Sequence, residues 1–557
     1  MTRPIDLMRA GRKEELWKMC CGFLNLNLEE FMSIQKRLLL EQIQLLKGCE
    51  MGRRLMRGAM PDTVQEFRDR VPLTTCEDYV PELTDRHEDW LPTRPAAWVH
   101  TVGRAGEYNF KWVPFPQRFM EEFERVAGGV GLLASCDERG GFLLKEHLRT
   151  LATMSSPYYG SGVVGHLMQQ ALGVDFLPSN FSMGGMTFQE KMKAGFDEAL
   201  AGGVDALGGL PAILVYLGEM IRQGDIEVDL PFLLKNPGAM ARVAKAQIRS
   251  RLAGRRMLPK DLWSIKVIVG GGVDSAIFRD RIEELWGRCP LEVYGGTEGG
   301  LYATQTWDHQ GMTFIPNLNF FEFIPEREWF RHQLDDSYRM KTVLLDEVRE
   351  GELYEPVITN FHGGIMTRYR LGDMVRITSL RNSRLNIDIP QMVFHSRVDD
   401  LVDVASLGRL TERTIGEAVE NTGIPYVDWV ARKEIIDNNP VLHIYLELDD
   451  GYIASGASVA AATREQFRKL DRRYRCNFYK LMGDMEEVLR LKPVEVTLLP
   501  QGAFASYSAQ RPAHANGLNG KKRSHINPSD EVISLLKAPK VVVEAVPVAD
   551  DERAVAR

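Results

Sequence analysis

The alternation of helical stretches with short apolar runs, from about residue 160 to residue 300, is the feature that most constrains the fold of this chain. Residues 212–216 (AILVY) and 265–270 (IKVIVG) each have the length of a buried strand. Glycines follow the second run, and after them comes a helix-like stretch, FRDRIEELW. Short apolar runs that alternate with helices predict parallel strands with helical crossovers. We therefore expect an α/β layer in the middle of the chain.

The length and the later pattern predict a second, smaller domain. A chain of 557 residues exceeds what one hydrophobic core usually supports. In residues 441–448 (VLHIYLEL) apolar and polar side chains alternate, which predicts a half-exposed strand. The predicted class is α/β, with mixed or parallel sheets in a large domain over residues 1–396. A mobile, small α+β domain is expected over residues 397–540, and a disordered tail over residues 541–557.

The N-terminal region contains one well-marked helix. Asn27 is followed three residues later by Glu30, the spacing of a capping box, and Gly48 is placed to end the helix. We expect Phe31, Ile34, Leu38 and Leu45 to form its buried face.

Composition excludes several classes of function. The formal net charge is −7, from 69 basic and 76 acidic residues without a long basic block, so no nucleic-acid partner is expected. No apolar window is long enough to span a bilayer and no secretory signal is visible, so we expect a cytoplasmic protein without a membrane partner. The seven cysteines are scattered without CxxC spacing, which is typical of reduced, buried thiols.

Residues 351–377 hold the first segment that could carry chemistry. An apolar stretch leads into Tyr369-Arg-Leu-Gly-Asp373, and another apolar stretch follows. A carboxylate held rigidly beside a strand can accept hydrogen bonds from the two hydroxyls of a ribose. Asp373 could equally be a turn residue preceded by a turn glycine.

The second segment is LEVYGGTEGG, residues 291–300, in which a short strand runs into glycines. Exposed backbone N–H groups at Gly295 could face a phosphate. Tyr294 can stack on a purine, Thr297 can donate to a phosphate oxygen and Glu298 can hold Mg²⁺. A glycine-rich tight turn without a ligand is the alternative.

Two further glycine-bearing segments are weaker signals. Gly270 and Gly271 follow a predicted strand and would let a flat base lie close to the backbone. Residues 98–112 have the composition of a phosphate-binding loop but do not match the P-loop pattern. The candidate ligands in that loop are Thr101, Gly103, Arg104, Gly106 and Lys111; Arg104 could bridge phosphate oxygens in a bidentate way.

Taken in order, these segments resemble the adenylate-forming ligases and, within them, the auxin-conjugating acyl-acid amido synthetases, most closely the bacterial members. The similarity runs from FRDRVPLTTCEDY (residues 67–79) to about residue 530. Its main features are the stretch GELYEPVITN, the Tyr369 to Asp373 turn and the Tyr294 to Glu298 turn. In residues 396–402 (SRVDDLV), Arg397 corresponds to a nucleotide-contacting arginine and Asp399 to the pivot of a hinge between two domains.

The resemblance implies a two-step reaction that uses ATP and Mg²⁺. A small-molecule carboxylic acid would form an acyl-adenylate, and the acyl group would then pass to an amine such as an amino acid. Coenzyme A is the alternative acceptor, and a nucleotide-binding regulatory homologue without turnover is the alternative of another class. The implied catalytic residues are Lys522, Glu298 and Arg104, with Lys521 as the alternative lysine. The phosphate-binding loop departs from the family pattern, because Val102 and Arg104 stand where hydroxyl side chains are common.

The acid pocket is the least defined part of the implied site. The resemblance places it between residues 154–162, which offer Tyr158 and Tyr159, and an apolar helix near residues 209–221.

Overall fold

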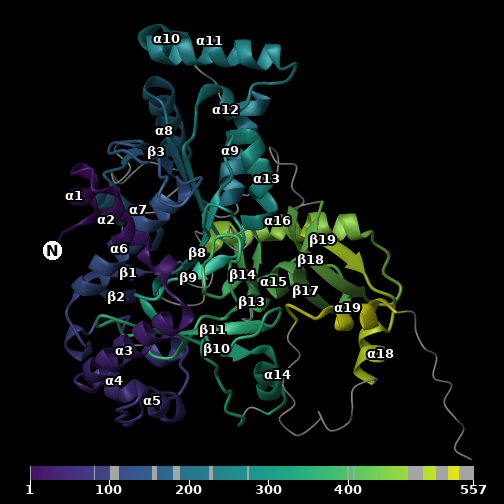
Figure 1. Cartoon of the computed structure of the whole chain (residues 1–557). Coiled ribbons are helices and arrows are strands. Elements are labelled where there is room, and N and C mark those ends of the chain that lie inside the picture. Colours follow the sequence, from purple (N-terminus) through teal and green to yellow (C-terminus); the bar gives the residue numbers. More distant parts are fainter. Residues whose placement is uncertain are drawn as a thin grey trace, which may run out of the picture.

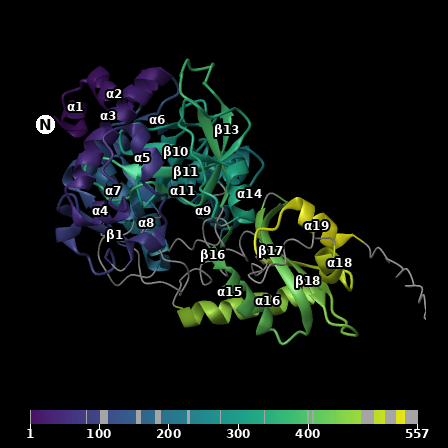
Figure 2. The ribbon, with the colours of Figure 1, turned by 90° about the horizontal axis from the view of Figure 1, so that it is seen from below.

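The computed structural model describes thirteen stretches of the chain. They are residues 2–80, 82–100, 112–152, 160–179, 188–224, 230–272, 275–335, 337–397, 401–404, 408–437, 439–474, 494–509 and 525–538. Figure 1 shows a large N-terminal part and a separate group of C-terminal elements, and Figure 2 shows the same separation from below.

A layer of helices opens the chain. It contains α1 (Pro4–Arg9), α2 (Lys13–Cys21), α3 (Leu28–Lys47), α4 (Glu50–Leu55) and α5 (Val64–Arg70), followed by the two-stranded sheet of β1 (Pro95–His100) and β2 (Trp112–Pro116).

The predicted capping box of α3 is confirmed. The Glu30 N–H donates to the Asn27 side chain and the Asn27 N–H donates to the Glu30 carboxylate, both at 2.9 Å. Phe31 and Leu38 are buried as predicted, whereas Leu45 is 36% exposed, because the inner face of the helix also includes Gln42. Two glutamines, Gln35 and Gln42, are also buried on this face, for which only apolar residues were predicted.

These glutamines fix α3 to the backbone of the large sheet. The Gln35 amide donates to the carbonyls of Pro316 and Asn319 and accepts from the N–H of Phe321. The Gln42 amide donates to the Gly364 carbonyl, and its oxygen accepts from the Gly363 N–H.

The large sheet has twelve strands among the described residues and changes direction in its middle. Its parallel half contains β4 (Asp175–Leu177), β3 (Arg149–Ala152), β5 (Ala206–Gly209), β6 (Val267–Gly271) and β7 (Leu291–Gly296). An antiparallel hairpin joins β7 to β8 (Gly300–Thr304), and from there the pairing is antiparallel. The antiparallel half continues through β9 (Met312–Phe314), β14 (Gln391–Arg397), β13 (Asp373–Ser379), β11 (Leu353–Asn360) and β10 (Asn319–Pro325), with β12 (Tyr369–Arg370) paired to β11.

Helices connect the parallel strands, as the alternation predicted. They include α6 (Gln117–Ala134), α7 (Gly160–Leu172), α8 (Phe188–Gly202), α9 (Pro211–Gln223), α12 (Pro259–Leu262) and α13 (Ser275–Trp286); α14 (Glu326–Leu334) follows β10. Residues 265–270 were correctly read as strand-forming, since they lead into and largely form β6.

The reading of residues 212–216 as a strand-like run is wrong. They lie inside α9, which begins with Pro211 at its first turn, and the neighbouring strand is β5, just before it. Proline suits the first turn of a helix, and an apolar run this short does not separate a strand from a fully buried helix. The α9 side chains pack in a core with α13, where the Trp286 indole donates to the Leu214 carbonyl at 2.9 Å.

The C-terminal elements form their own sheets. A hairpin of β15 (Leu401–Val404) and β16 (Gly408–Thr411) precedes α15 (Glu412–Glu420), and a three-stranded sheet contains β17 (Tyr426–Ile436), β18 (Asn439–Leu448) and β19 (Val494–Leu498). The accompanying helices are α16 (Gly456–Tyr474), α18 (Ala503–Ala509) and α19 (Asp530–Lys537). The α/β class with a large mixed sheet and a further C-terminal sheet is therefore confirmed.

The strand predicted at residues 441–448 is confirmed as β18, but its predicted half-exposed face is wrong. His443, Tyr445 and Glu447 are all buried, because β18 is the central strand of its sheet and both of its faces are covered. The face that carries Leu442, Ile444 and Leu446 lies in one core, and Tyr445 lies in a second core with residues of α18 and α19.

The polar side chains of β18 are satisfied inside this packing. His443 contacts the Glu434 carboxylate at 2.7 Å and the Thr497 hydroxyl at 2.8 Å. Glu447 accepts from the N–H groups of Gly502 and Phe504, and so it caps the start of α18.

Within the described residues, we find no helix whose length and apolar character would let it cross a lipid bilayer.

The α3 cap gives a first testable prediction. We expect Asn27→Ala to lower the free energy of unfolding by about 1 kcal/mol, because the Glu30 N–H at the helix start loses its side-chain acceptor. Urea unfolding followed by tryptophan fluorescence measures this change. Ser33→Ala, at an exposed position of the same helix, is the control, and an equal effect of the two substitutions would contradict the prediction.

Candidate active site

Three of the predicted site residues meet at one carboxylate. Asp373, the first residue of β13, is paired in register with Arg397, the last residue of β14. Arg397 Nη1 lies 3.0 Å from Asp373 Oδ1, and the Tyr294 hydroxyl donates to Asp373 Oδ2 at 2.8 Å. Tyr294 comes from β7, so strands from both halves of the sheet contribute. Motifs that lie up to about a hundred residues apart in the sequence therefore meet at the Asp373 carboxylate.

Electrostatics keep this arrangement in one protonation state. Burial, together with the neighbouring Asp373 carboxylate, raises the pKa of Tyr294 well above its ordinary value. The phenol is therefore neutral and acts as a donor at physiological pH. Arg397 supplies the positive charge that offsets a carboxylate only 8% exposed.

The turn that leads to Asp373 is held by a second carboxylate. Gly372 has φ +69°, in the left-handed region that favours glycine. It is therefore a turn glycine, as the alternative interpretation of this segment expected. Glu355 of β11 binds Arg370 through both carboxylate oxygens and accepts from the Gly372 N–H at 3.3 Å. Asp373 thus begins its strand from a fixed turn.

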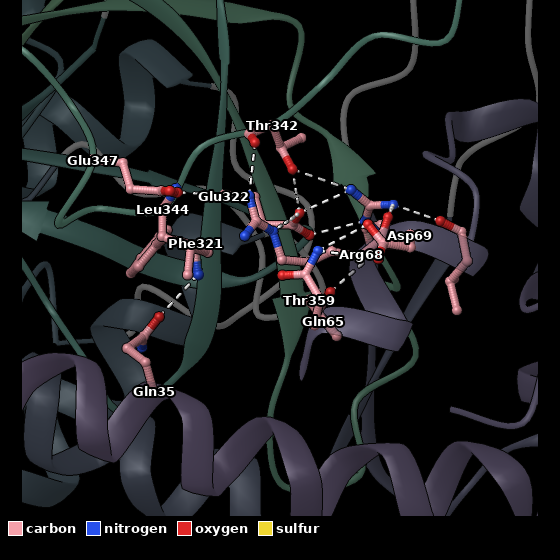
Figure 3. A network of polar contacts seen from close by, with 12 residues as sticks. Gln35, Gln65, Arg68, Asp69, Phe321, Glu322, Thr342, Leu344, Glu347 and Thr359 are labelled. Carbon is pink, nitrogen blue, oxygen red and sulfur yellow. Dashed lines mark hydrogen bonds and ion pairs between the residues drawn. The ribbon is translucent and has the colours of Figure 1, made fainter. Parts of the chain in front are cut away.

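A buried ion pair between Arg368 and Glu322 fixes the residue before this turn. Figure 3 shows Glu322 in a network of polar contacts with Thr342 and Arg68. Arg368, itself at φ +45°, binds Glu322 through Nε at 2.9 Å and Nη2 at 2.8 Å. Its Nη1 donates to the carbonyls of Arg68 and Val71 at the end of α5. Glu322 also accepts from the Thr342 hydroxyl at 2.6 Å. Sequence reasoning missed this network, because its members are isolated charged residues far apart in the chain.

The β7–β8 turn, which carries Thr297 and Glu298, is the second part of the site. A Cβ at Gly295 would lie 2.5 Å from the Gly300 carbonyl, so the hairpin requires glycine there. The Asn360 amide donates to the Glu298 carbonyl at 3.0 Å, and the Asn319 amide donates to the Gly299 carbonyl at 2.8 Å. The two asparagines are also bonded to each other at 2.8 Å.

Both asparagines were missed as supports of the turn. Asn360 ends the GELYEPVITN stretch, so a polar residue at the end of an apolar strand was the available signal.

The start of α7 lies against this turn. A Cβ at Gly160, the first residue of α7, would lie 2.8 Å from the Thr297 hydroxyl oxygen. The first turn of a helix presents unpaired N–H groups and the positive end of its dipole. Thr297 and the start of α7 together can therefore receive an anionic group such as a phosphate.

Gly270 and Gly271 end β6, one strand away from Tyr294. Gly270 is in register with Glu292 of β7, and a Cβ at Gly270 would lie 3.3 Å from Pro211. A hollow at this point is lined by Pro211, Gly270, Ser275, Ala276, Arg279, Pro290, Glu292 and Gln305. Burial raises the pKa of Glu292 to about 7, although Arg279 opposes the shift. Glu292 was not selected from the sequence, since a strand glutamate two positions before Tyr294 gives no separate pattern.

The remaining predicted residues cannot be placed in this geometry. The loop residues Thr101, Gly103, Arg104, Gly106 and Lys111, the hinge residue Asp399, the lysines Lys521 and Lys522, and the pocket tyrosines Tyr158 and Tyr159 all lie outside the described residues.

The family model described as the GH3 family central domain matches residues 312–397, the segment that contains Asn319, Glu322, Asn360, Asp373 and Arg397.

Curated proteins are similar to part of this sequence. Jasmonoyl–L-amino acid synthetase JAR6 of Nicotiana attenuata is 31% identical over 212 residues, 36% of this chain and 34% of that protein. Jasmonoyl–L-amino acid synthetase GH3.5 of Oryza sativa subsp. japonica is 34% identical over 172 residues, 28% of each chain. The alignments thus span about a third or less of the length of these relatives.

Solved structures match the fold over nearly the whole chain. The acyl acid amido synthetase AtGH3.15 in complex with 2,4-DB has a TM-score of 0.50 at 17% identity and covers 93% of this chain and 95% of that one. A 2-hydroxyisobutyryl-CoA ligase in the thioesterification state has a TM-score of 0.53 at 16% identity and covers 91% of each chain. The predicted resemblance to the amido synthetases is confirmed by the sequence similarity to curated amino acid synthetases, and the solved structures share the fold of this chain.

The Glu322–Arg368 pair gives a prediction on stability. We expect Glu322→Ala to lower the free energy of unfolding by about 3 to 5 kcal/mol, because it leaves the Arg368 charge buried without its partner. Urea unfolding provides the measurement. The control is Glu41→Ala, which removes an exposed ion pair with Arg37 and should cost about 1 kcal/mol or less. Similar losses for the two variants would show that the buried pair has no special role.

Proposed function

We propose that this protein is an ATP-dependent acyl-acid amido synthetase, which forms an acyl-adenylate from a small carboxylic acid and transfers the acyl group to an amino acid. The observation that carries this proposal is the meeting of Tyr294, Asp373 and Arg397 at one buried carboxylate. Similarity to the curated jasmonoyl–L-amino acid synthetases supports an amine as the acceptor.

The residues around Asp373 fit a nucleoside triphosphate such as ATP. Asp373 is held by two partners but is a carboxylate with two oxygens, and each oxygen can accept more than one hydrogen bond. It is therefore able to accept from ribose hydroxyls while it stays paired with Arg397. Gly270 and Gly271 leave room for the base beside β7, and Tyr294 would border the base as well as hold Asp373. Gly295, Thr297 and the start of α7 would receive phosphate oxygens.

Glu298 is our candidate ligand for Mg²⁺. No group of three or more His, Cys, Asp or Glu side chains with metal-binding geometry occurs within the described part of the chain. Mg²⁺ bound with a nucleotide commonly uses one or two carboxylates and takes its other ligands from phosphates and water, so a single glutamate fits. When bound, the ion would neutralise charge on the phosphates.

In the first half-reaction the carboxylate of the acid attacks the α-phosphorus of ATP, and pyrophosphate leaves. The protein's contribution is to position the two reactants and to stabilise negative charge that builds on the phosphate. We assign this stabilisation to Thr297, the start of α7, Lys522 and the loop residues Thr101, Gly103, Arg104, Gly106 and Lys111. In the second half-reaction an amine attacks the acyl carbon and AMP leaves.

We further propose a division of labour between a large domain, residues 1–396, and a mobile domain, residues 397–540, with Asp399 as the hinge. Rotation about Asp399 would withdraw Lys522 after adenylation and admit the acceptor. The expected cytoplasmic location and the tail over residues 541–557 stay predictions.

The first test of this function is ATP–pyrophosphate exchange with a panel of acids, followed by product mass after addition of amino acids or coenzyme A. Acid-dependent exchange with an amide product is the expected result. A thioester product would indicate a CoA ligase instead. Nucleotide binding with no exchange for any acid would indicate a regulatory homologue.

The site residues are tested by hydroxamate formation. We expect Asp373→Ala and Glu298→Gln each to lower the rate by about 100-fold or more, because each removes an interaction with the reacting nucleotide. The controls are Asp346→Ala and Glu350→Gln, which change exposed carboxylates of the same large domain. Wild-type rates in both site variants would remove these residues from the reaction.

The catalytic lysine is tested by separating the half-reactions. We expect Lys522→Ala to lose adenylation, since a positive charge near the phosphates is missing, and to retain acyl transfer from supplied acyl-AMP. Lys521→Ala serves as the neighbouring control and should retain both activities. The reverse pattern would assign the role to Lys521.

A further inference from the structure

The helices α10 (Leu230–Lys235) and α11 (Pro237–Leu252) lie together at one end of the large domain, across the top of the molecule in Figure 1. One face of α11 is bound to the domain. Ala239, Ala246 and Ser250 are buried on that face. Arg242 donates to the carbonyls of Leu200 and Ala201 near the end of α8, both at 2.8 Å. The orientation of α11 on the domain is therefore fixed.

The opposite face of α11 carries an apolar row that faces solvent. Met240, Ala244, Ile248 and Leu252 follow each other at intervals of four residues, which places them along one side of a helix. Met240 is 45% exposed, Ile248 59% and Leu252 84%. In α10, Leu230 and Leu234 continue the pattern at 67% exposed each. Large apolar side chains grouped in this way on a surface mark an interaction site.

Basic residues surround the apolar row. Residues 230–260 contain eight basic and no acidic residues, although the whole chain has a formal net charge of −7. With about 100° per residue, Lys245 and Arg251 lie about 60° to either side of Ile248. Both side chains belong to exposed residues. Of the other six basic residues, Arg242 is bound to the domain and Arg255 pairs with Asp261, so neither counts toward the docking surface. The remaining four are Lys235, Arg249, Arg256 and Lys260.

We propose that α10 and α11 form a docking surface for a lipid bilayer that contains anionic headgroups. The row of Met240, Ile248 and Leu252 enters the boundary between headgroups and acyl chains, as in other interfacial amphipathic helices. Lys245 and Arg251 extend along the apolar row to the lipid phosphates. An interfacial helix needs no membrane-spanning segment, so the surface departs from the expectation, drawn from the sequence, that the chain has no membrane partner.

Two observations favour a bilayer over an acidic protein. The apolar side chains are spread over two helices instead of forming anchors for one groove. The helices lie at an end of the domain, where a planar surface can approach them (Figure 1). The proposal is independent of the ligase function.

The test is sedimentation of the full chain with vesicles of equal parts phosphatidylglycerol and phosphatidylcholine, and with vesicles of phosphatidylcholine alone. We expect binding to the anionic vesicles, weakened by added salt because screening shortens the range of the charges. Lys245→Glu with Arg251→Glu should lower the affinity at least about tenfold, since the two charges that flank the apolar row would then repel the anionic headgroups. Ile248→Ser with Leu252→Ser should lower it by a similar factor.

The controls carry equivalent changes at other exposed positions. Lys36→Glu with Arg384→Glu matches the charge change, and Ile453→Ser matches the apolar change at a side chain 94% exposed. These variants should bind vesicles as the wild type does, and all variants should keep its circular dichroism spectrum. Failure of the wild type to bind anionic vesicles would overturn the proposal and indicate an acidic protein as the partner. Binding that the two α11 double variants leave unchanged would overturn it as well.

Discussion

The contact of Asp373 with Arg397 and Tyr294 is the interaction on which the rest of the site depends. It joins β7 to the ends of β13 and β14, strands that come from the two halves of the large sheet. A buried carboxylate in such a place is stable only with a charge partner and a hydrogen-bond donor, and it has both. The same contact sets the distance between the turn that carries Glu298 and the strand that begins with Asp373. Without it the two motifs, which lie on strands that are not neighbours in the sheet, would not form one site.

A second set of buried polar groups holds these strands in place. Glu355 fixes the turn before Asp373, Glu322 fixes Arg368, and Asn319 with Asn360 fixes the β7–β8 turn. Each of these partners comes from β10 or β11, the two strands at one edge of the antiparallel half. The role of those strands is therefore to supply the polar groups that orient the site, in addition to completing the core. Buried, fully paired groups of this kind are rigid, and a site that must align two reactants needs that rigidity.

The sequence predicted the local features well and the long-range partners poorly. The capping box at Asn27 and the strand ending at Gly271 follow from rules that act over a few residues, and they were found. The fold family was found because its glycine-bearing turns are also local patterns. The Arg368–Glu322 pair and the glutamines of α3 join segments that are far apart, so no spacing in the sequence indicates them. The buried polar face of β18 was missed for the same reason, since α18 and α19 cover a face whose alternation indicated exposure to water.

The central claim, that separate turns form one mononucleotide site, is tested most directly by a crystal structure of the protein with a non-hydrolysable acyl-adenylate analogue. The account predicts the adenosine between Gly270 and Tyr294, its ribose hydroxyls on Asp373 and its phosphate-like group beside Thr297. An analogue bound in another cavity, with its ribose away from Asp373, would contradict the account.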